Sequence, residues 1–123
     1  MLIEGEKILI TGTHGFLGRN LAKKFSRKGA KIYGIGNGEY SSEEMMELGI
    51  IKYISGDINL SNLLNTCEKP NKIIHCGSSS SVSKSVSNPR NDFERTVNST
   101  LSVLELMRLY SNNSQLVIPS SAA

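Results

Sequence analysis

Short apolar runs alternate along the chain with stretches in which apolar residues recur at helical spacing. Each run lies between turn-forming residues and has about four to eight residues, which is typical of a strand buried on both faces. The predicted strands are Lys7–Thr11, Lys31–Ile35, Ile50–Ser55, Lys72–Gly77 and Gln115–Pro119.

A helix is predicted in each interval between these strands. Ser41 and Ser42 followed by Glu44 indicate the start of a short helix, and Gly49 indicates its end. Pro89 suits the first turn of the last and longest helix. This longest helix is predicted at Pro89–Tyr110, and the remaining two at Phe16–Arg27 and about Ser61–Cys67. One face of the longest helix is formed by Phe93, Val97, Leu101, Leu104 and Met107 or Arg108.

This alternation of strands and helices predicts an α/β fold, because parallel strands need right-handed helical crossovers. We expect a doubly wound, Rossmann-type sheet of five parallel strands in the order 3-2-1-4-5. Ligands bind such sheets at the carboxyl ends of the strands, where the strand order reverses. The loops after Thr11 and Gly77 are therefore expected to line a site.

The strongest chemical signal is TGTHGFLG, Thr11–Gly18, between the first predicted strand and the first predicted helix. Gly12 allows a sharp turn off the strand, Gly15 leaves room for a pyrophosphate, and Gly18 allows close packing of helix on sheet. The helix N-terminus offers free N–H groups to phosphates. The turn predicts nucleotide binding; a purely structural turn is the alternative.

Composition narrows the possible functions. The 123 residues suffice for one small domain, and the net charge of +3 comes from scattered basic residues, so no nucleic-acid surface is expected. No apolar run has the roughly 20 residues that cross a bilayer, and the first residues do not resemble a signal peptide. Cys67 and Cys76 are expected to be reduced thiols of a cytoplasmic protein.

A metal site is not expected, because the chain has two histidines, His14 and His75, without ligand spacing. His75 lies inside a predicted strand and is interpreted as a buried structural histidine.

Thr11–Gly18 resembles the TGxxGFxG fingerprint of the extended short-chain dehydrogenase/reductases, which are NAD(P)-dependent sugar-nucleotide epimerases, dehydratases and reductases. Further stretches in matching order are similar to segments of the same family. They are Gly56–Ile58 (GDI), Ile73–Pro89, Thr96–Leu106 (TVNSTLSVLEL) and Val117–Ala123 (VIPSSAA). The resemblance covers essentially the whole chain.

The resemblance implies a cofactor domain that binds NAD or NADP, and a full enzyme that transfers hydride at a carbon of a nucleotide sugar. It implies an adenine contact from Asp57 and Ile58, and backbone near the nicotinamide ribose from Gly77 and Ser78. The residues that it assigns to the cofactor are Gly12, Thr13, Gly15, Phe16, Leu17, Gly18, Asn37, Asp57, Ile58, Cys76, Gly77 and Ser78.

The choice between NAD and NADP depends on the end of the second strand. Gly36 stands where NAD-using members carry an acidic residue for the ribose 2′-OH, so Asn37 or Glu39 is left to bind that hydroxyl. His14 and Arg19 are near enough in sequence to help bind an NADP phosphate. We favour NAD, because no Lys or Arg follows the second strand.

Ser121 matches the family's supporting catalytic Ser/Thr, whereas the family's Tyr-x-x-x-Lys motif is not found among these residues. We therefore expect residues 1–123 to be the N-terminal, partial cofactor domain of a longer enzyme, cut after the fifth strand and without the substrate domain. Alone it is expected to be inactive. The alternative is a non-catalytic nucleotide-binding or assembly module.

Association into a homodimer is expected, because Leu116, Val117 and Ile118 form an apolar strand at the sheet edge. Pro119 limits pairing at that edge, which favours the long helix as the interface.

Overall fold

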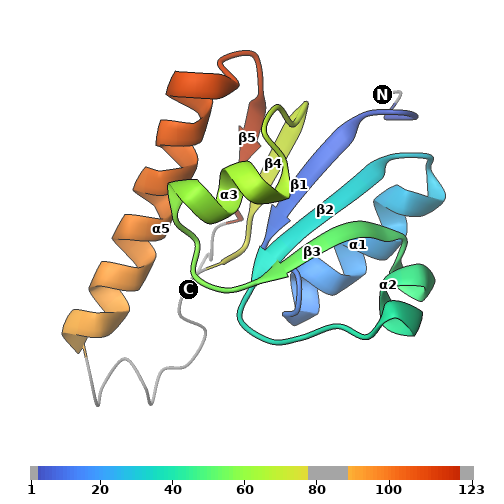
Figure 1. Ribbon diagram of the computed structural model, residues 1–123, viewed down its shortest axis with the longest axis horizontal. Coiled ribbons are helices and arrows are strands. Elements are labelled where there is room, and N and C mark those ends of the chain that lie inside the picture. The colour runs from blue at the N-terminus through green and yellow to red at the C-terminus, as the bar shows by residue number, and fades with distance from the viewer. Residues whose placement is uncertain (1–2, 78–88, 120–123) are drawn as a thin grey trace.

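The computed structural model describes residues 3–77 and 89–119. Five parallel strands form one sheet in the order β3-β2-β1-β4-β5 (Figure 1). The strands are β1 (Lys7–Thr11), β2 (Lys31–Gly36), β3 (Ile50–Ser55), β4 (Lys72–His75) and β5 (Gln115–Val117). The predicted fold class and strand order are confirmed, and the order reverses between β1 and β4.

Helices cover both faces of the sheet (Figure 1). Alternate residues of β1 point to opposite layers: Ile8 and Ile10 pack towards α1 and α2, and Leu9 packs towards α3 and α5. The helices are α1 (Phe16–Arg27), α2 (Ser42–Leu48), α3 (Leu60–Thr66) and α5 (Pro89–Tyr110). Each face of the central strands is thus buried, which explains their nearly continuous apolar sequence.

The predicted ends of α2 are confirmed by its capping contacts. The Glu44 N–H donates to Ser41 Oγ, and the Ser41 N–H donates to Glu44 Oε1, both at 3.1 Å. Gly49 follows the helix with φ of +73°, a conformation that favours glycine. These local signals define both ends of a short helix, and its buried Leu48 packs it onto the α1 side of the core.

Strand β4 ends at His75, two residues before the predicted end. The Cys76 N–H still donates to the Thr11 carbonyl, but the Gly77 N–H donates to the Thr11 side chain, Oγ1, at 2.9 Å. The ladder stops because a side-chain oxygen replaces the next backbone acceptor. Strand β5 likewise ends at Val117, before Pro119, which has no N–H to donate.

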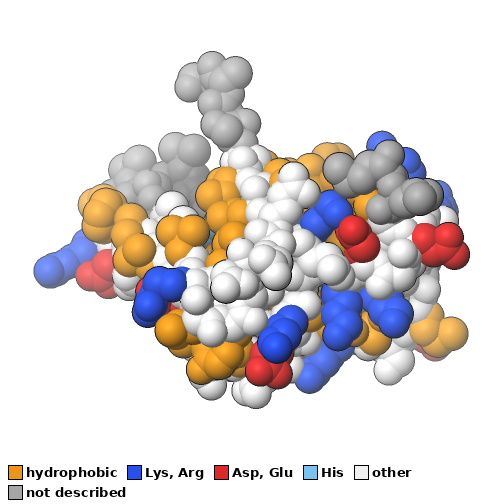
Figure 2. Space-filling model, turned by 90° about the horizontal axis from the view of Figure 1, so that it is seen from above, with side chains coloured by type: hydrophobic (Ala, Val, Ile, Leu, Met, Phe, Trp, Pro, Cys, Tyr) orange, Lys and Arg blue, Asp and Glu red, His pale blue; other side chains and the backbone are white. Residues whose placement is uncertain are grey.

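The long helix α5 buries Ser99, Val103 and Leu106 against the α3 side of the sheet. The apolar face predicted from the sequence is a different one, and much of it is exposed, including Phe93 and Leu104. Hydrophobic side chains gather at the α5 side of the molecule (Figure 2). None of the described helices combines the length and hydropathy needed to cross a membrane.

Replacing Leu106 with Ala should lower the free energy of unfolding by about 2–5 kcal/mol, because this side chain is fully buried and its loss leaves a cavity. Leu109→Ala is the matched control on the same helix. Leu109 is 47% exposed, so the expected loss is below about 1 kcal/mol. Denaturant unfolding followed by circular dichroism measures both, and equal losses would contradict the orientation of α5.

Candidate functional site

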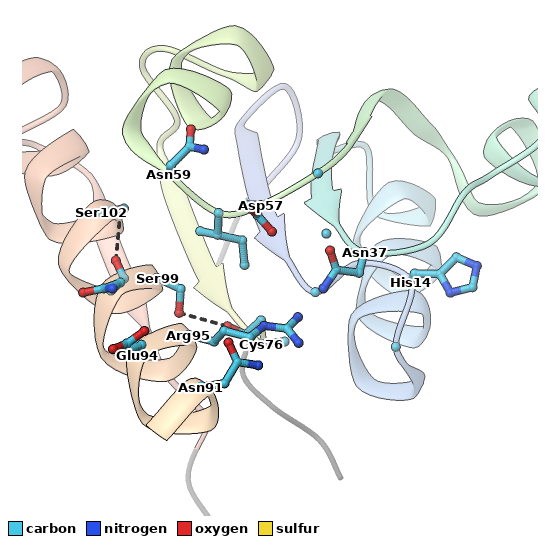
Figure 3. A pocket seen from close by; sticks show the side chains of 17 residues that line it. His14, Asn37, Asp57, Asn59, Cys76, Asn91, Glu94, Arg95, Ser99 and Ser102 are labelled. Atoms are coloured by element: carbon cyan, nitrogen blue, oxygen red, sulfur yellow. Dashed lines mark hydrogen bonds between the residues drawn. The ribbon is translucent and has the colours of Figure 1, made fainter. Parts of the chain in front are cut away.

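A cleft of about 710 Å³ opens at the carboxyl ends of the central strands, where the strand order reverses (Figure 3). Its walls come from the loops after β1, β2, β3 and β4 and from one side of α5. Residues of the four loops that line the cleft include Gly12, His14, Gly15, Asn37, Asp57 and Gly77. The sequence predicted the loops after Thr11 and Gly77 as the site, and the cleft lies between them.

The floor of the cleft is bare backbone. Gly12 has φ of +68°, and a Cβ on it would lie 2.8 Å from both the carbonyl carbon of Cys76 and the nitrogen of Gly77. No side chain fits there, so the loops after β1 and β4 touch through their main chains. A Cβ on Gly18 would lie 2.4 Å from the Gly12 oxygen, which explains how α1 comes so close to the turn.

The N-terminus of α1 faces this floor without a side-chain cap. The N-cap residue is Gly15, which has no side chain that could accept a hydrogen bond from the first turn. The first turn also contains no acidic residue. The first N–H groups of a helix have no partner within the helix and carry partial positive charge. The arrangement therefore suits an anionic group placed above Gly12 and Gly15.

Two tyrosines hold the loop after β2, which forms a side wall. The Tyr40 hydroxyl donates to the Thr13 carbonyl at 2.7 Å, and the Tyr53 hydroxyl lies 3.1 and 2.9 Å from the Gly36 and Gly38 carbonyls. Burial raises the pKa of Tyr53 to about 12, so its hydroxyl remains a donor at neutral pH. Asn37 from this loop is turned towards the cleft (Figure 3).

His14 and Arg19, considered from sequence as cations near the cofactor, both lie against the Tyr40 ring. The two ring centroids of His14 and Tyr40 are 4.8 Å apart, and the Arg19 guanidinium carbon lies 5.5 Å from the Tyr40 centroid. His14 lines the cleft, whereas Arg19 lines a separate small hollow between α1 and α2.

The loop after β3 brings Asp57 and Ile58 to the cleft, and Figure 3 shows Asp57 near Asn37. The Asp57 carbonyl accepts a hydrogen bond from Asn62 Nδ2 at 2.8 Å, which fixes the turn at the start of α3. Ile58 packs over Gly77: a Cβ on that glycine would lie 2.3 Å from Ile58 Cδ1. A carboxylate beside an apolar side chain suits a flat heterocycle with an exocyclic amino group.

Helix α5 contributes a polar wall that sequence reasoning missed. Figure 3 shows Arg95 extending from α5 into the cleft beside Glu94. The remaining residues of this wall are Asn91, Asn98, Ser99 and Ser102. Taken together with Glu94 and Arg95, these residues recur every three or four positions and so form one polar stripe along the helix. This pattern is visible in the sequence and could have identified them.

The cleft unites most of the residues assigned to the cofactor by resemblance. Those that line it are Gly12, Gly15, Asn37, Asp57, Ile58, Cys76 and Gly77. Thr13 is fully buried beneath the turn and accepts the Ile35 N–H at 3.0 Å. Phe16 and Leu17 are outside the lining, and the Phe16 side chain is 87% exposed. Ser78 and Ser121 lie outside the described residues.

The thiols and the acidic residues indicate neither a nucleophile nor a metal site in the described part of the chain. Burial raises the pKa of the Cys76 thiol at the cleft and of the Cys67 thiol in the core, which disfavours the reactive thiolate. Within residues 3–77 and 89–119, no group of three His, Cys, Asp or Glu side chains is arranged to hold a metal ion.

The chain is similar in sequence and fold to several epimerases. CDP-paratose 2-epimerase of Salmonella typhi is 32% identical over 123 residues, covering 94% of this chain and 36% of that protein. The structure of epimerase Mth375 from Methanothermobacter thermautotrophicus superposes with a TM-score of 0.81 at 26% identity. The match covers 98% of this chain and 36% of that protein. UDP-glucose 4-epimerase from Bifidobacterium longum, solved with NAD+ and UDP, shares the fold at 22% identity, with a TM-score of 0.76 and coverage of 94% and 37%.

The chain thus spans little more than a third of the length of these relatives. The family model of the NAD dependent epimerase/dehydratase family matches residues 8–123, which is nearly the whole chain. The expected resemblance is confirmed: this chain belongs to the NAD-dependent epimerase/dehydratase family.

Proposed function

We propose that the cleft binds a nicotinamide dinucleotide, and that residues 1–123 form the N-terminal cofactor-binding part of a nucleotide-sugar epimerase or dehydratase. The observation that carries the proposal is the bare floor at Gly12 and Gly77, which faces the uncapped N-terminus of α1. A pyrophosphate needs this combination: no side chain in its path and N–H groups directed at its charge.

In this proposal each part of the cofactor has its own wall. The pyrophosphate lies over Gly12 and Gly15, and Asn37 bonds the adenosine ribose. Asp57 accepts from the adenine amino group while Ile58 packs on the ring. The nicotinamide half extends past Gly77 towards α5. The relatives solved with NAD support this class of cofactor.

The chemistry proposed for the whole enzyme is hydride transfer between a sugar carbon and the nicotinamide, which the cofactor supplies when bound. Ser121 would support the sugar oxygen, and the names of the relatives favour a nucleotide-sugar substrate. The 123 residues contain no Tyr-x-x-x-Lys motif to act as acid and base, so we propose binding without turnover for this chain alone. Its free cysteines fit a cytoplasmic location.

Gly15→Val should weaken NAD+ binding by about tenfold or more, because the added side chain occupies the space proposed for the pyrophosphate. The fold should survive, since φ of −74° at Gly15 suits any residue and a Cβ there needs a shift of only a few tenths of an ångström from the Gly12 carbonyl oxygen, 3.3 Å away. Titration calorimetry measures the affinity, with Lys24→Val on the exposed face of α1 as the control. Equal affinities of the parent and Gly15→Val would refute the placement of the pyrophosphate.

NAD+ should bind more tightly than NADP+, by about tenfold. The 2′-phosphate of NADP+ would lose its hydration water in the cleft, and no Lys or Arg at the end of β2 would compensate for that loss. Asn37, Gly38 and Glu39 follow Gly36, and Arg19 lies away from the cleft. Competition of the two cofactors in one titration measures the ratio. If NADP+ binds as well and His14→Ala selectively abolishes that binding, the preference is reversed and His14 is the phosphate ligand.

We further propose a homodimer through the exposed apolar stripe of α5, which includes Leu101 and Leu104. Light scattering should give twice the 13.4 kDa mass of one chain, and the double variant Leu101→Glu/Leu104→Glu should give that single mass. Lys24→Glu, an exposed residue of α1 on the opposite face of the sheet from α5, should leave the dimer intact. A parent that stays at 13.4 kDa at high concentration excludes this interface.

A further inference from the structure

Both backbone polar groups of Gly77 are bound by side chains from neighbouring elements. Its N–H donates to Thr11 Oγ1 of β1 at 2.9 Å, and its carbonyl lies 3.2 Å from Ser99 Oγ of α5, whose single proton is shared between this carbonyl and that of Thr96 at 3.0 Å. This glycine is the one whose nitrogen lies against Gly12 in the floor of the cleft. The hydroxyls of Thr11 and Ser99 therefore decide where the floor lies.

The imidazole of His75 lies between these same hydroxyls. Its Nδ1 is 2.6 Å from Thr11 Oγ1, and its Nε2 is 3.1 Å from Thr100 Oγ1 and 3.5 Å from Ser99 Oγ. The ring is 5% exposed and connects β4 to β1 on one side and to α5 on the other. His75 does not line the cleft, so it acts on the floor through its partners.

The hydrogen-bond partners select one protonation state of the ring. Thr100 donates its hydroxyl proton to the Thr96 carbonyl at 2.9 Å, so its oxygen accepts from His75 Nε2–H. A neutral ring that carries its proton on Nε2 has an acceptor at Nδ1, so Thr11 donates its hydroxyl proton to Nδ1 while its oxygen accepts the Gly77 N–H. The neutral ring with the proton on Nε2 thus leaves every group paired.

We infer that neutral His75 is a positioning residue of the dinucleotide cleft: it orients the Thr11 hydroxyl that holds the Gly77 N–H opposite Gly12, and it anchors this pair to α5 through Thr100. The part of this inference that concerns cofactor binding rests on the proposed function. Its structural part, the position of Gly77, can be measured without a cofactor.

Protonation would break this arrangement. A proton on Nδ1 would turn the acceptor of Thr11 into a second donor, and the Thr11 hydroxyl proton would lose its partner in a buried place. The side chains that contact the ring from β1 and α5 are uncharged: Thr11, Ser99 and Thr100. Among charged groups, Glu94 and Arg95 of α5 line the nearby cleft, and the titratable Cys76 thiol follows in the chain.

Burial lowers the pKa of His75 and none of these groups offsets it. The folded state therefore holds fewer protons than the unfolded state below about pH 6.5, so stability falls as the pH drops towards the lowered pKa.

The first experiment observes the ring and the Gly77 amide by NMR, without cofactor. In the parent, the imidazole ¹⁵N shifts should show Nε2–H, and the Gly77 amide should be protected from exchange. His75→Phe should accelerate that exchange by about tenfold, whereas His75→Asn, whose Oδ1 can accept from Thr11, should keep it within about threefold. An Nδ1–H tautomer, or unchanged Gly77 exchange in His75→Phe, would overturn the inference.

The second experiment measures NAD+ affinity by calorimetry from pH 8 to pH 5. Parent affinity should fall about tenfold on acidification, His75→Phe should bind weakly at every pH, and His75→Asn should bind well and without that pH dependence. Ser111→Ala is the matched control, because it removes a buried hydrogen bond to the Pro70 carbonyl at the other end of the same β4–α5 pair. It should alter stability without altering affinity.

The outcomes separate the two proposals. A parent that binds no NAD+ refutes the proposed function, and Gly77 exchange still decides whether His75 positions the floor. A parent that binds NAD+ as tightly as His75→Phe at all pH values refutes the inference while leaving the proposed function intact.

Discussion

The close approach of two main chains at the centre of the sheet governs the rest of this molecule. Gly12 and Gly77 meet where the strand order reverses, and α1 reaches the same point through Gly18. Any Cβ at these positions would overlap backbone or a packed side chain, which cannot move far in a close-packed interior. The cleft exists because three segments approach here without side chains, and the helix N-terminus is directed into it for the same reason.

Much of this arrangement could be predicted from local sequence signals. Apolar runs with turn residues define β1 to β5, the Ser41 and Glu44 pair defines α2, and the glycine spacing in TGTHGFLG predicts the turn. The polar wall of α5 and the end of β4 were not predicted. The end of β4 depends on a contact between residues far apart in sequence, Thr11 Oγ1 with the Gly77 N–H, which no local pattern encodes. The polar wall of α5 does carry a local signal, a polar stripe at helical period, but that stripe does not by itself say that it faces a cleft.

Helix α5 illustrates a second limit of periodicity. Its sequence carries an apolar stripe, but the helix buries a narrower face with Val103 and Leu106 and turns Leu104 outward. One side of α5 packs on the sheet, another lines the cleft and a third is exposed, so the helix has no single amphipathic face. The spacing of its apolar residues alone therefore cannot show which side packs inward. The burial of Ser99 follows from its bond to Gly77 rather than from hydropathy.

The loop after β2 has a thermodynamic consequence for ligand capture. Tyr40 and Tyr53 bond the Thr13, Gly36 and Gly38 carbonyls, so this loop is held by hydrogen bonds within the chain itself. Ordering a free backbone costs about 1–2 kcal/mol per residue, and here folding has already met that cost. The loop therefore loses little conformational entropy when a ligand binds. Selectivity at Asn37 then follows from the fixed shape of the loop and not from a rearrangement of the loop around the ligand.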